Sequence, residues 1–524
     1  MSVAKVVGAV GVLGTVGCGG GDEPVPETTG GQDTGAPAVQ LVASARHLTQ
    51  AGTVQLAASA SDAVGVTRVV FFDGTTKVGE DAEAPYALEL SFSHANNGAH
   101  AFTAHAFDAA GNESTSAAVT VQVEVPWTKQ VGVAGDDYLA GVATDAAGNL
   151  YVVGNSYVPM TGSALGEQDG YLLKYAPDGS LLWARTVGTS EYDEVQGVAV
   201  SADGHVYVVG LTYGAFEGQT NQGGYDLFLA QYTQDGAAGW VREVGSSDWD
   251  YAAAVRVDAA GNAVVLGNSY GTLEGQTHLG EMDAFVVRYA VDGTVSWVRT
   301  VGSSAYEWAR GLAVDAQGDV FVAGQTSGQV GETARVGGYD AFLVKLSGAT
   351  GETQWARQTG STADDYVSGL AVAADGSLYL SGTTYGALEG DSSAGDADLY
   401  LARYAANGTR TWTRQLGSTD YDEVSAVAVD AQGNAYLAGS TYGELLGAPK
   451  DANGNALVAS YSPEGTRRWV QQVGSTGYQW AAGVAVHGNL VYVVGGTDGQ
   501  VDGQPSSGGD DGFIARFDTN GAKP

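Results

Sequence analysis

The sequence predicts an all-β protein, an immunoglobulin-like β-sandwich followed by a seven-bladed β-propeller, and three observations support this. The 524 residues include 79 glycines but only 11 prolines, and short runs of alternating Val, Tyr, Leu and Phe are separated by turn residues. Such a composition favours many short strands joined by tight turns. With 44% hydrophobic residues, the chain can also bury substantial cores. Tryptophan recurs about every 57 residues over the last three quarters of the chain, which indicates a repeated structural unit.

The N-terminal residues predict export. An apolar run over residues 6–17 follows Lys5; it is too short for a membrane span of about 20 residues but is typical of a signal-peptide core. The stretch Thr15, Val16, Gly17, Cys18 resembles the bacterial lipobox. This resemblance implies a lipoprotein signal peptide over residues 1–18 that ends at the lipidated Cys18; the alternative is an uncleaved apolar tail. Because Gly19 stands where an aspartate would signal retention, the resemblance implies an outer-membrane lipoprotein that faces the surface or the periplasm.

Cys18 is the only cysteine, so no intrachain disulfide and no thiolate metal cluster can form. Residues 19–36, "GGGDEPVPETTGGQDTGA", contain almost nothing apolar to bury. We interpret them as a flexible linker with a coil dimension of roughly 25 Å, which would hold a folded domain clear of a lipid surface.

Residues 37–125 carry six alternating runs separated by turn signals, among them "TVQLAASA", "TRVVFFD" and "AVTVQVEV". This spacing predicts a β-sandwich. The stretch "AHAFDAAGNES", Ala104 to Ser114, is similar to the penultimate strand and following turn of bacterial immunoglobulin-like domains. Three histidines lie in this region, His94, His100 and His105. Scattered strand histidines are more often ordinary surface or packed residues than metal ligands.

Residues 127–518 form seven units, each read as four short strands. One unit runs "AAVRVDAAGN", "AVVLGNSYG", a loop, "DAFVVRYAVDG" and "VSWVRTVGSS". A four-stranded meander cannot bury both faces alone, so we expect the units to stack radially into a propeller. The strand tryptophans, repeated at one register, are predicted to pack between adjacent blades. They are Trp127, Trp183, Trp240, Trp297, Trp355, Trp412 and Trp469.

The two ends of the repeat array predict how the ring closes. The last unit stops at Phe517 and Asp518 without its tryptophan strand, whereas the first begins with an isolated one, "WTKQVG". We therefore expect the strand at residues 127–133 to complete the C-terminal blade, which leaves no half-blade with an unpaired edge.

The phrases "GLAVDAQGDVFVAGQTSG" (Gly311 to Gly328), "GGYDAFLVKL" (Gly337 to Leu346) and "QWARQTGS" (Gln354 to Ser361) resemble the SBBP, or seven-bladed beta-propeller, repeats of bacterial exported proteins. The resemblance spans all seven units. It implies the fold and the exported location but no reaction, because a fold alone does not supply a function.

A repeated acidic loop is the main candidate site. An acid stands four residues before the "GVAV"-like strand in six units, Gln479 takes the seventh place, and aromatic residues flank it in every unit. Because first strands line a propeller's channel, these side chains are predicted to surround its mouth as a ligand-binding rim. They are Asp137, Tyr138, Tyr192, Asp193, Trp249, Asp250, Tyr251, Tyr306, Glu307, Trp308, Asp365, Tyr366, Tyr421, Asp422, Tyr478 and Trp480.

Periodicity favours a second interpretation, in which each acid caps its own turn and each ring covers its own blade. The aspartate that opens each third strand is likewise predicted to accept backbone N–H groups from the long preceding loop. It occurs at Asp169, Asp226, Asp283, Asp340, Asp398 and Asp511, with Asn455 in the sixth unit.

The net charge of −36 excludes nucleic acid as a partner, because the surface repels phosphate. We expect a monomeric, non-catalytic binding, adhesion or scaffold protein that engages an extracellular glycan or protein and touches the membrane only through its lipid. No catalytic residue, metal or cofactor is assigned, and structural calcium that bridges acidic loops is a further possibility. The rival function is a surface glycoside hydrolase or lyase that uses a carboxylate pair, Asp420 with Asp422 or Glu191 with Asp193.

Overall fold

The computed structural model describes residues 33–523 except 49–51, 93–95, 124, 126, 163–164, 274, 389–390, 446–453 and 475–476. Every regular element among the described residues is a β-strand. The structure divides into two compact units, one built mostly from residues before 122 and the other mostly from Gln122 onward.

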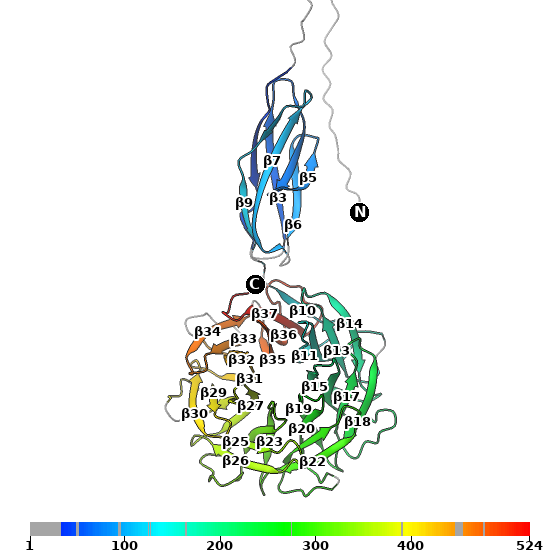
Figure 1. Ribbon diagram of the computed structural model, residues 1–524, viewed down its shortest axis with the longest axis vertical. Coiled ribbons are helices and arrows are strands. Elements are labelled where there is room, and N and C mark those ends of the chain that lie inside the picture. The colour runs from blue at the N-terminus through cyan, green and yellow to red at the C-terminus, as the bar shows by residue number, and fades with distance from the viewer. Residues whose placement is uncertain are drawn as a thin grey trace, which may run out of the picture. The chain divides into compact units, whose positions relative to one another are not determined.

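The first unit is the expected two-sheet sandwich (Figure 1). Its smaller sheet has the order β1 (Ala38–Ala43), β3 (Gly52–Ser61), β6 (Tyr86–Phe92). Its larger sheet has the order β2 (His47–Leu48), β9 (Val119–Val123), β7 (Gly98–Asp108), β4 (Val66–Asp73), β5 (Thr76–Asp81), with β8 (Glu113–Thr115) paired to β7. Val54 and Leu56 of β3 and Phe71 of β4 are fully buried. Alternation along each strand therefore places one face in the core.

The second unit consists of seven four-stranded antiparallel sheets, the blades (Figure 1). Blade 1 is β11 (Asp137–Thr144), β12 (Leu150–Ser156), β13 (Asp169–Tyr175), β14 (Leu181–Val187). Blade 2 is β15 (Asp193–Val200), β16 (Val206–Thr212), β17 (Asp226–Tyr232), β18 (Ala238–Val244). Blade 3 is β19 (Asp250–Val257), β20 (Ala263–Ser269), β21 (Asp283–Tyr289), β22 (Val295–Val301). Blade 4 is β23 (Glu307–Val314), β24 (Val320–Thr326), β25 (Asp340–Leu346), β26 (Thr353–Thr359).

The remaining blades follow the same pattern. Blade 5 is β27 (Asp365–Val372), β28 (Leu378–Thr384), β29 (Asp398–Tyr404), β30 (Arg410–Leu416). Blade 6 is β31 (Asp422–Val429), β32 (Ala435–Thr441), β33 (Asn455–Tyr461), β34 (Arg467–Val473). Blade 7 is β35 (Gln479–His487), β36 (Leu490–Thr497), β37 (Asp511–Asp518) and, from the start of the unit, β10 (Thr128–Val131).

Strand β10 pairs antiparallel with β37, so Thr128 lies opposite Ala515 and Val131 opposite Gly512. The strand predicted at residues 127–133 thus completes the C-terminal blade, although its hydrogen-bonded core is the shorter Thr128–Val131. The side chains of Trp127, Leu139 and Tyr492 belong to one buried cluster that joins blades 7 and 1. The first strands β11, β15, β19, β23, β27, β31 and β35 lie innermost around the central channel (Figure 1).

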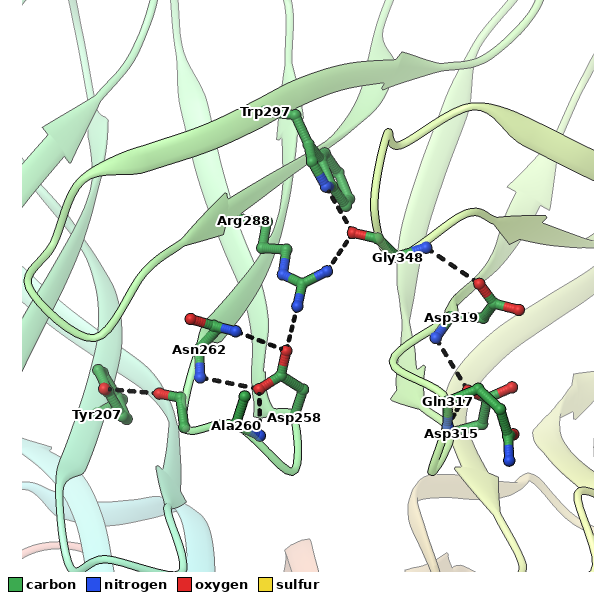
Figure 2. Close-up of polar contacts among 11 residues, drawn as sticks. Tyr207, Asp258, Ala260, Asn262, Arg288, Trp297, Asp315, Gln317, Asp319 and Gly348 are labelled. Atoms are coloured by element: carbon green, nitrogen blue, oxygen red, sulfur yellow. Dashed lines mark hydrogen bonds and ion pairs between the residues drawn. The ribbon is translucent and has the colours of Figure 1, made fainter.

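The "DAAGN" turns between first and second strands are held by their own aspartate, as Figure 2 shows for Asp258. Its Oδ1 accepts the N–H groups of Ala260 and Asn262, both at 2.9 Å, and its Oδ2 accepts the Asn262 amide at 2.9 Å. Gly261 in this turn has φ of 85°, a left-handed conformation that glycine adopts without cost. Each such aspartate therefore closes its own hairpin turn.

The strand tryptophans pack between adjacent blades, as predicted. Trp297 of blade 3 is 7% exposed, and its Nε1 donates to the carbonyl oxygen of Gly348 in blade 4 at 2.9 Å (Figure 2). Arg288 of blade 3 donates to the same carbonyl and pairs with Asp258. A Cβ at Gly351, in the same turn of blade 4, would lie 2.8 Å from the Trp297 ring. The indole therefore fixes the turn of the next blade by contact and by hydrogen bond.

Candidate functional site

The predicted signal peptide, the lipidated Cys18 and most of the predicted linker lie outside the described residues. No helix among the residues that the structure describes is long and apolar enough to cross a membrane.

The repeated loop acids cap their own loops. Asp193 Oδ2 accepts the backbone N–H of Thr189 at 2.6 Å and its hydroxyl at 2.9 Å, and Asp250 Oδ2 accepts Ser246 in the same way. All six acids are at most 1% exposed. The prediction that these acids line the mouth is therefore wrong, because burial and backbone donors hold them inside the loops. This correction applies to Asp137, Asp193, Asp250, Glu307, Asp365 and Asp422.

The aspartates that open the third strands accept loop N–H groups, as predicted. Asp169 Oδ2 accepts Leu165 N–H at 2.9 Å, and Asp340 Oδ2 accepts Val336 N–H at 2.7 Å. The structure adds that each of them faces the loop acid of the next blade. The facing pairs are Asp169 with Asp193, Asp226 with Asp250, Asp283 with Glu307, Asp340 with Asp365, Asp398 with Asp422, and Asp511 with Asp137, while Asn455 and Gln479 take both places between blades 6 and 7.

The carboxyl groups of these pairs are buried and shielded from water. Burial, reinforced by the facing carboxylate of Asp169, raises the pKa of Asp193. Burial raises the pKa of Asp226 to about 6, and the nearby Asp250 and Glu243 act in the same direction. Removing hydration disfavours the charged form of a carboxyl, and a second carboxylate disfavours it further. The pairs lie between blades and belong to the construction of the ring.

The aromatic residues of the predicted rim lie together, except Tyr138, which belongs to neither of the two runs that the others form. Neighbouring rings have centroids 4.1 to 6.4 Å apart and form two runs on the face where the second-to-third and fourth-to-first loops emerge. We call these residues the aromatic belt. The first run is Tyr192, Tyr213, Tyr225, Trp249, Tyr251, Tyr270 and Trp308, and the second is Tyr306, Tyr339, Tyr366, Tyr385, Tyr421, Tyr442, Tyr478 and Trp480.

Several belt side chains present large apolar surfaces to solvent. Trp249 is 46% exposed, and Tyr213, Tyr270 and Tyr385 are also exposed. Exposed aromatic groups that gather on one face mark a binding surface. The belt stops between blades 7 and 1, where Asp136, Asp498 and Asp510 take the equivalent places. Burial raises the pKa of Asp510, and repulsion from the carboxylates of Asp136 and Asp498 raises it further.

The belt surrounds two cavities at the channel mouth. One, of about 330 Å³, is lined by Tyr138, Glu194, Tyr251, Trp308 and Trp480, by Gln196 and Arg310, and by small or aliphatic residues. The other, of about 470 Å³, is lined by the belt rings Tyr306, Trp308, Tyr366 and Tyr421 and by Arg310 and Glu423. Both volumes fall within the range of small-molecule sites.

Sequence reasoning missed the polar residues of this mouth. Glu194, Arg310 and Glu423 lie on the inner strands β15, β23 and β31, one or three places after the buried loop acid. Residues that alternate with buried ones on an inner strand face the channel, so the spacing could have identified them. It also missed the belt tyrosines of the second-to-third loops, although "TYG" and "SYG" recur directly after the second strand.

Among the described residues, one group of three carboxylates could hold a metal ion: Asp33, Asp62 and Asp108 in the sandwich unit. Asp62 Oδ1 accepts Val64 N–H at 2.8 Å, and Asp108 accepts the backbone and the amide of Asn112, both at 2.8 Å. These carboxylates therefore already hold turns. His100 and His105 pair with Asp73 and Glu113, which is ordinary surface pairing.

Comparison with known families agrees with both units. Residues 37–104 match the bacterial Ig domain family, and residues 127–159 and 411–447 match the SBBP beta-propeller repeat. The chain carries a bacterial Ig domain and SBBP repeats. A curated relative, the regulatory protein FlaEY of Caulobacter vibrioides (strain ATCC 19089 / CIP 103742 / CB 15), is 26% identical over 306 residues, which are 51% of this chain and 31% of FlaEY. The SBBP-repeat chain thus matches about a third of the length of that relative.

Solved structures resemble the SBBP propeller in outline. Puromycin hydrolase is 14% identical, and the match covers 74% of this chain and 54% of the hydrolase, with a TM-score of 0.40. A PL25 ulvan lyase is 10% identical, and the match covers 75% of this chain and 97% of the lyase, with a TM-score of 0.44. At this level of similarity the matches carry no argument about activity.

Proposed function

We propose that this protein is an exported, lipid-anchored binding module whose propeller captures an extracellular glycan or protein on the aromatic belt. The observation that carries the proposal is the gathering of exposed rings around a hollow mouth. Rings such as Trp249 and Tyr213 offer flat apolar faces. Glu194 and Glu423, which line the mouth, offer hydrogen-bond acceptors. Ring construction accounts for the buried tryptophans and acids, but it does not require exposed ones.

A binding screen tests this proposal. The chain from residue 37 to 524 is presented to glycan arrays and to cell-surface extracts, beside a Trp249→Ala, Tyr213→Ala double variant. Leu181→Ala is the matched control, because Leu181 is an exposed apolar residue on the fourth strand of blade 1, outside the belt. Loss of binding in the belt variant with retention in the control supports the proposal. Equal binding by all three proteins removes the site from the belt.

The membrane attachment is proposed to depend on Cys18 alone. Metabolic labelling with a fatty acid should mark the wild-type protein and not Cys18→Ser, and the variant should leave the membrane fraction. Labelled Cys18→Ser, or membrane retention of that variant, contradicts the lipid anchor. The proposal further takes the protein to be a monomer without a cofactor; size-exclusion chromatography and a melting scan with and without a chelator test these two points.

The rival function, a polysaccharide-degrading enzyme, shifts to different residues. Asp193 and Asp422 are buried and accept backbone N–H groups. One carboxylate of each expected pair is therefore inaccessible to a sugar. The observation that keeps an enzyme in consideration is Glu194, which lines the mouth and whose pKa is raised by burial, as a general acid requires. Release of reducing ends from a polysaccharide, abolished by Glu194→Gln, would establish the rival.

A further inference from the structure

The seven inner strands can be compared with one another, because equivalent positions of each strand line the mouth. One place after the loop acid, five blades carry an aromatic residue and two carry a glutamate: Tyr138, Glu194, Tyr251, Trp308, Tyr366, Glu423 and Trp480. Three places after it, the residues are small except in blades 2 and 4: Ala140, Gln196, Ala253, Arg310, Ser368, Ser425 and Ala482. All of the second set line the channel. The ring therefore departs from its own symmetry at Glu194, Gln196, Arg310 and Glu423.

Ring construction does not explain these departures. The same strands form in the other blades with an aromatic ring or an alanine at those places, so the fold does not need a charge there. Arg310 opens onto the channel lumen, where the surrounding walls remove enough water to lower its pKa, while the carboxylate of Glu423 acts in the opposite direction. Arg310 is nevertheless solvent-exposed on its strand, and a few charged groups that converge on a pocket are typical of a functional site.

The Arg310 guanidinium is also available to a ligand. It lies 5.8 Å from the centroid of the Trp308 ring and makes no hydrogen bond or ion pair with the described residues around it. Glu423, two blades away, accepts a hydrogen bond from the hydroxyl of Tyr421 at 3.2 Å. Arg310, Glu423 and Trp308 line the same cavity of about 470 Å³.

The charges of the mouth restrict the class of ligand. A polyanion is repelled by a chain of net charge −36 and by two glutamates, and a cation meets Arg310 within the channel. A hydroxyl group both donates and accepts hydrogen bonds, so a pair of neighbouring hydroxyls satisfies a carboxylate and a guanidinium together. The apolar face of a sugar ring fits an indole.

We propose that the mouth binds a neutral saccharide, with its ring stacked on Trp308 and its hydroxyl groups shared between Arg310 and Glu423. This inference rests on the proposed binding function and narrows its ligand. Glu194 and Gln196, which are hydrogen-bonded to each other on the opposite wall, contact the next sugar unit in the cavity of about 330 Å³.

Isothermal titration of the full chain against three saccharide classes tests the inference. The probes are neutral oligosaccharides (gluco-, manno- and galacto-tetraoses), oligogalacturonate and chitosan oligomers. We expect at least one neutral class to bind, and Arg310→Met, Glu423→Gln and Trp308→Ala each to weaken it at least tenfold. Arg256→Met is the matched control, because Arg256 lies in the same channel but lines neither of the two mouth cavities; the affinity of this variant should stay within twofold of the wild-type value.

A second variant separates folding from binding. Glu194→Tyr, Gln196→Ala, Arg310→Ala and Glu423→Tyr together restore the symmetry of the ring, and we expect an unchanged or higher melting temperature with no saccharide binding. Binding of only the charged oligomers, failure of every neutral probe, or neutral binding insensitive to Arg310→Met overturns the inference. If a protein ligand nevertheless binds and is lost in the Trp249→Ala, Tyr213→Ala variant, the proposed function stands without it; if nothing binds the belt, both fail.

Discussion

Asp169 and Asp193 belong to neighbouring blades, yet their carboxylates lie against the same glycine, Gly188. A Cβ at this position would be 2.8 Å from Asp169 Oδ1 and 2.9 Å from Asp193 Oδ2. Equivalent glycines stand beside the other pairs. At Gly360, for example, an added Cβ would lie 2.6 Å from Asp340 Oδ1 and 2.9 Å from Asp365 Oδ2. The absence of a side chain therefore allows two buried carboxyl groups to approach between blades.

Gly188→Ala should consequently destabilise the propeller. The added methyl group must push apart two groups that are held by backbone hydrogen bonds, and overpacking of this kind costs roughly 1–3 kcal/mol. Urea unfolding measures the change. Gly197→Ala is the control, since the nearest atom to its Cβ would be at 3.5 Å, an ordinary contact; equal stability of the two variants would contradict the packing argument.

The buried pairs should make the propeller less stable as the pH rises. The folded state raises the pKa of Asp226 from 3.8 to about 6, so its stabilising contribution is complete below about pH 4 and is lost as the pH passes through 6. Asp137, Asp193, Asp250, Asp365 and Asp422 are shifted in the same direction by burial. The turn aspartates such as Asp258 have a lowered pKa, so the stability that they contribute is lost only as the pH falls below about 4.

Calorimetry between pH 4 and 8 measures this dependence. For Asp226 alone the loss is on the order of 2–3 kcal/mol, and Asp226→Asn should flatten the curve by that amount. A melting temperature that rises steadily from pH 4 to 7 would show that the pairs do not titrate as described.

The interface between blades 6 and 7 offers a natural comparison, because Asn455 and Gln479 replace both carboxyl groups there. Asn455→Asp combined with Gln479→Glu should lower the melting temperature at pH 7 more than at pH 5, since two adjacent buried carboxylates repel when both are ionised. The isosteric change leaves packing intact, so a loss that is independent of pH would point to a hydrogen-bonding cause instead.

Two tryptophans should separate stability from binding. Trp297→Ala removes a buried indole and its hydrogen bond to Gly348 and should cost about 3–5 kcal/mol of unfolding free energy. Trp249→Ala, at an exposed ring, should change stability by no more than about 0.5 kcal/mol but weaken ligand binding. Thermal unfolding and the binding screen are run on both; the reverse pattern would exchange their roles.

Much of the fold could be predicted because each repeat carries the same turn and strand residues at the same spacing. The turn aspartates, the glycines with left-handed φ and the strand tryptophans act within one blade or on the next one, so their spacing in sequence is enough to assign them. The residues of the candidate site were harder to predict from the sequence. The repeat placed Asp193 and Glu194 side by side in the chain, and only the direction of each side chain from β15 shows that the first is buried and the second faces the channel.

The sequence by itself determined the all-β class, the sandwich and the propeller repeat, because these follow from periodic local patterns. It also determined the strand that completes the last blade, because the repeat array has one isolated strand at its start and lacks one at its end. Only the tertiary structure decided which side chains meet across blades: the pairing of Asp169 with Asp193 around Gly188, the union of belt rings from different loops, and the placement of Arg310 with Glu423 in one cavity. The physical reason is that these contacts join residues tens to hundreds of positions apart, and closure of the ring sets their distances.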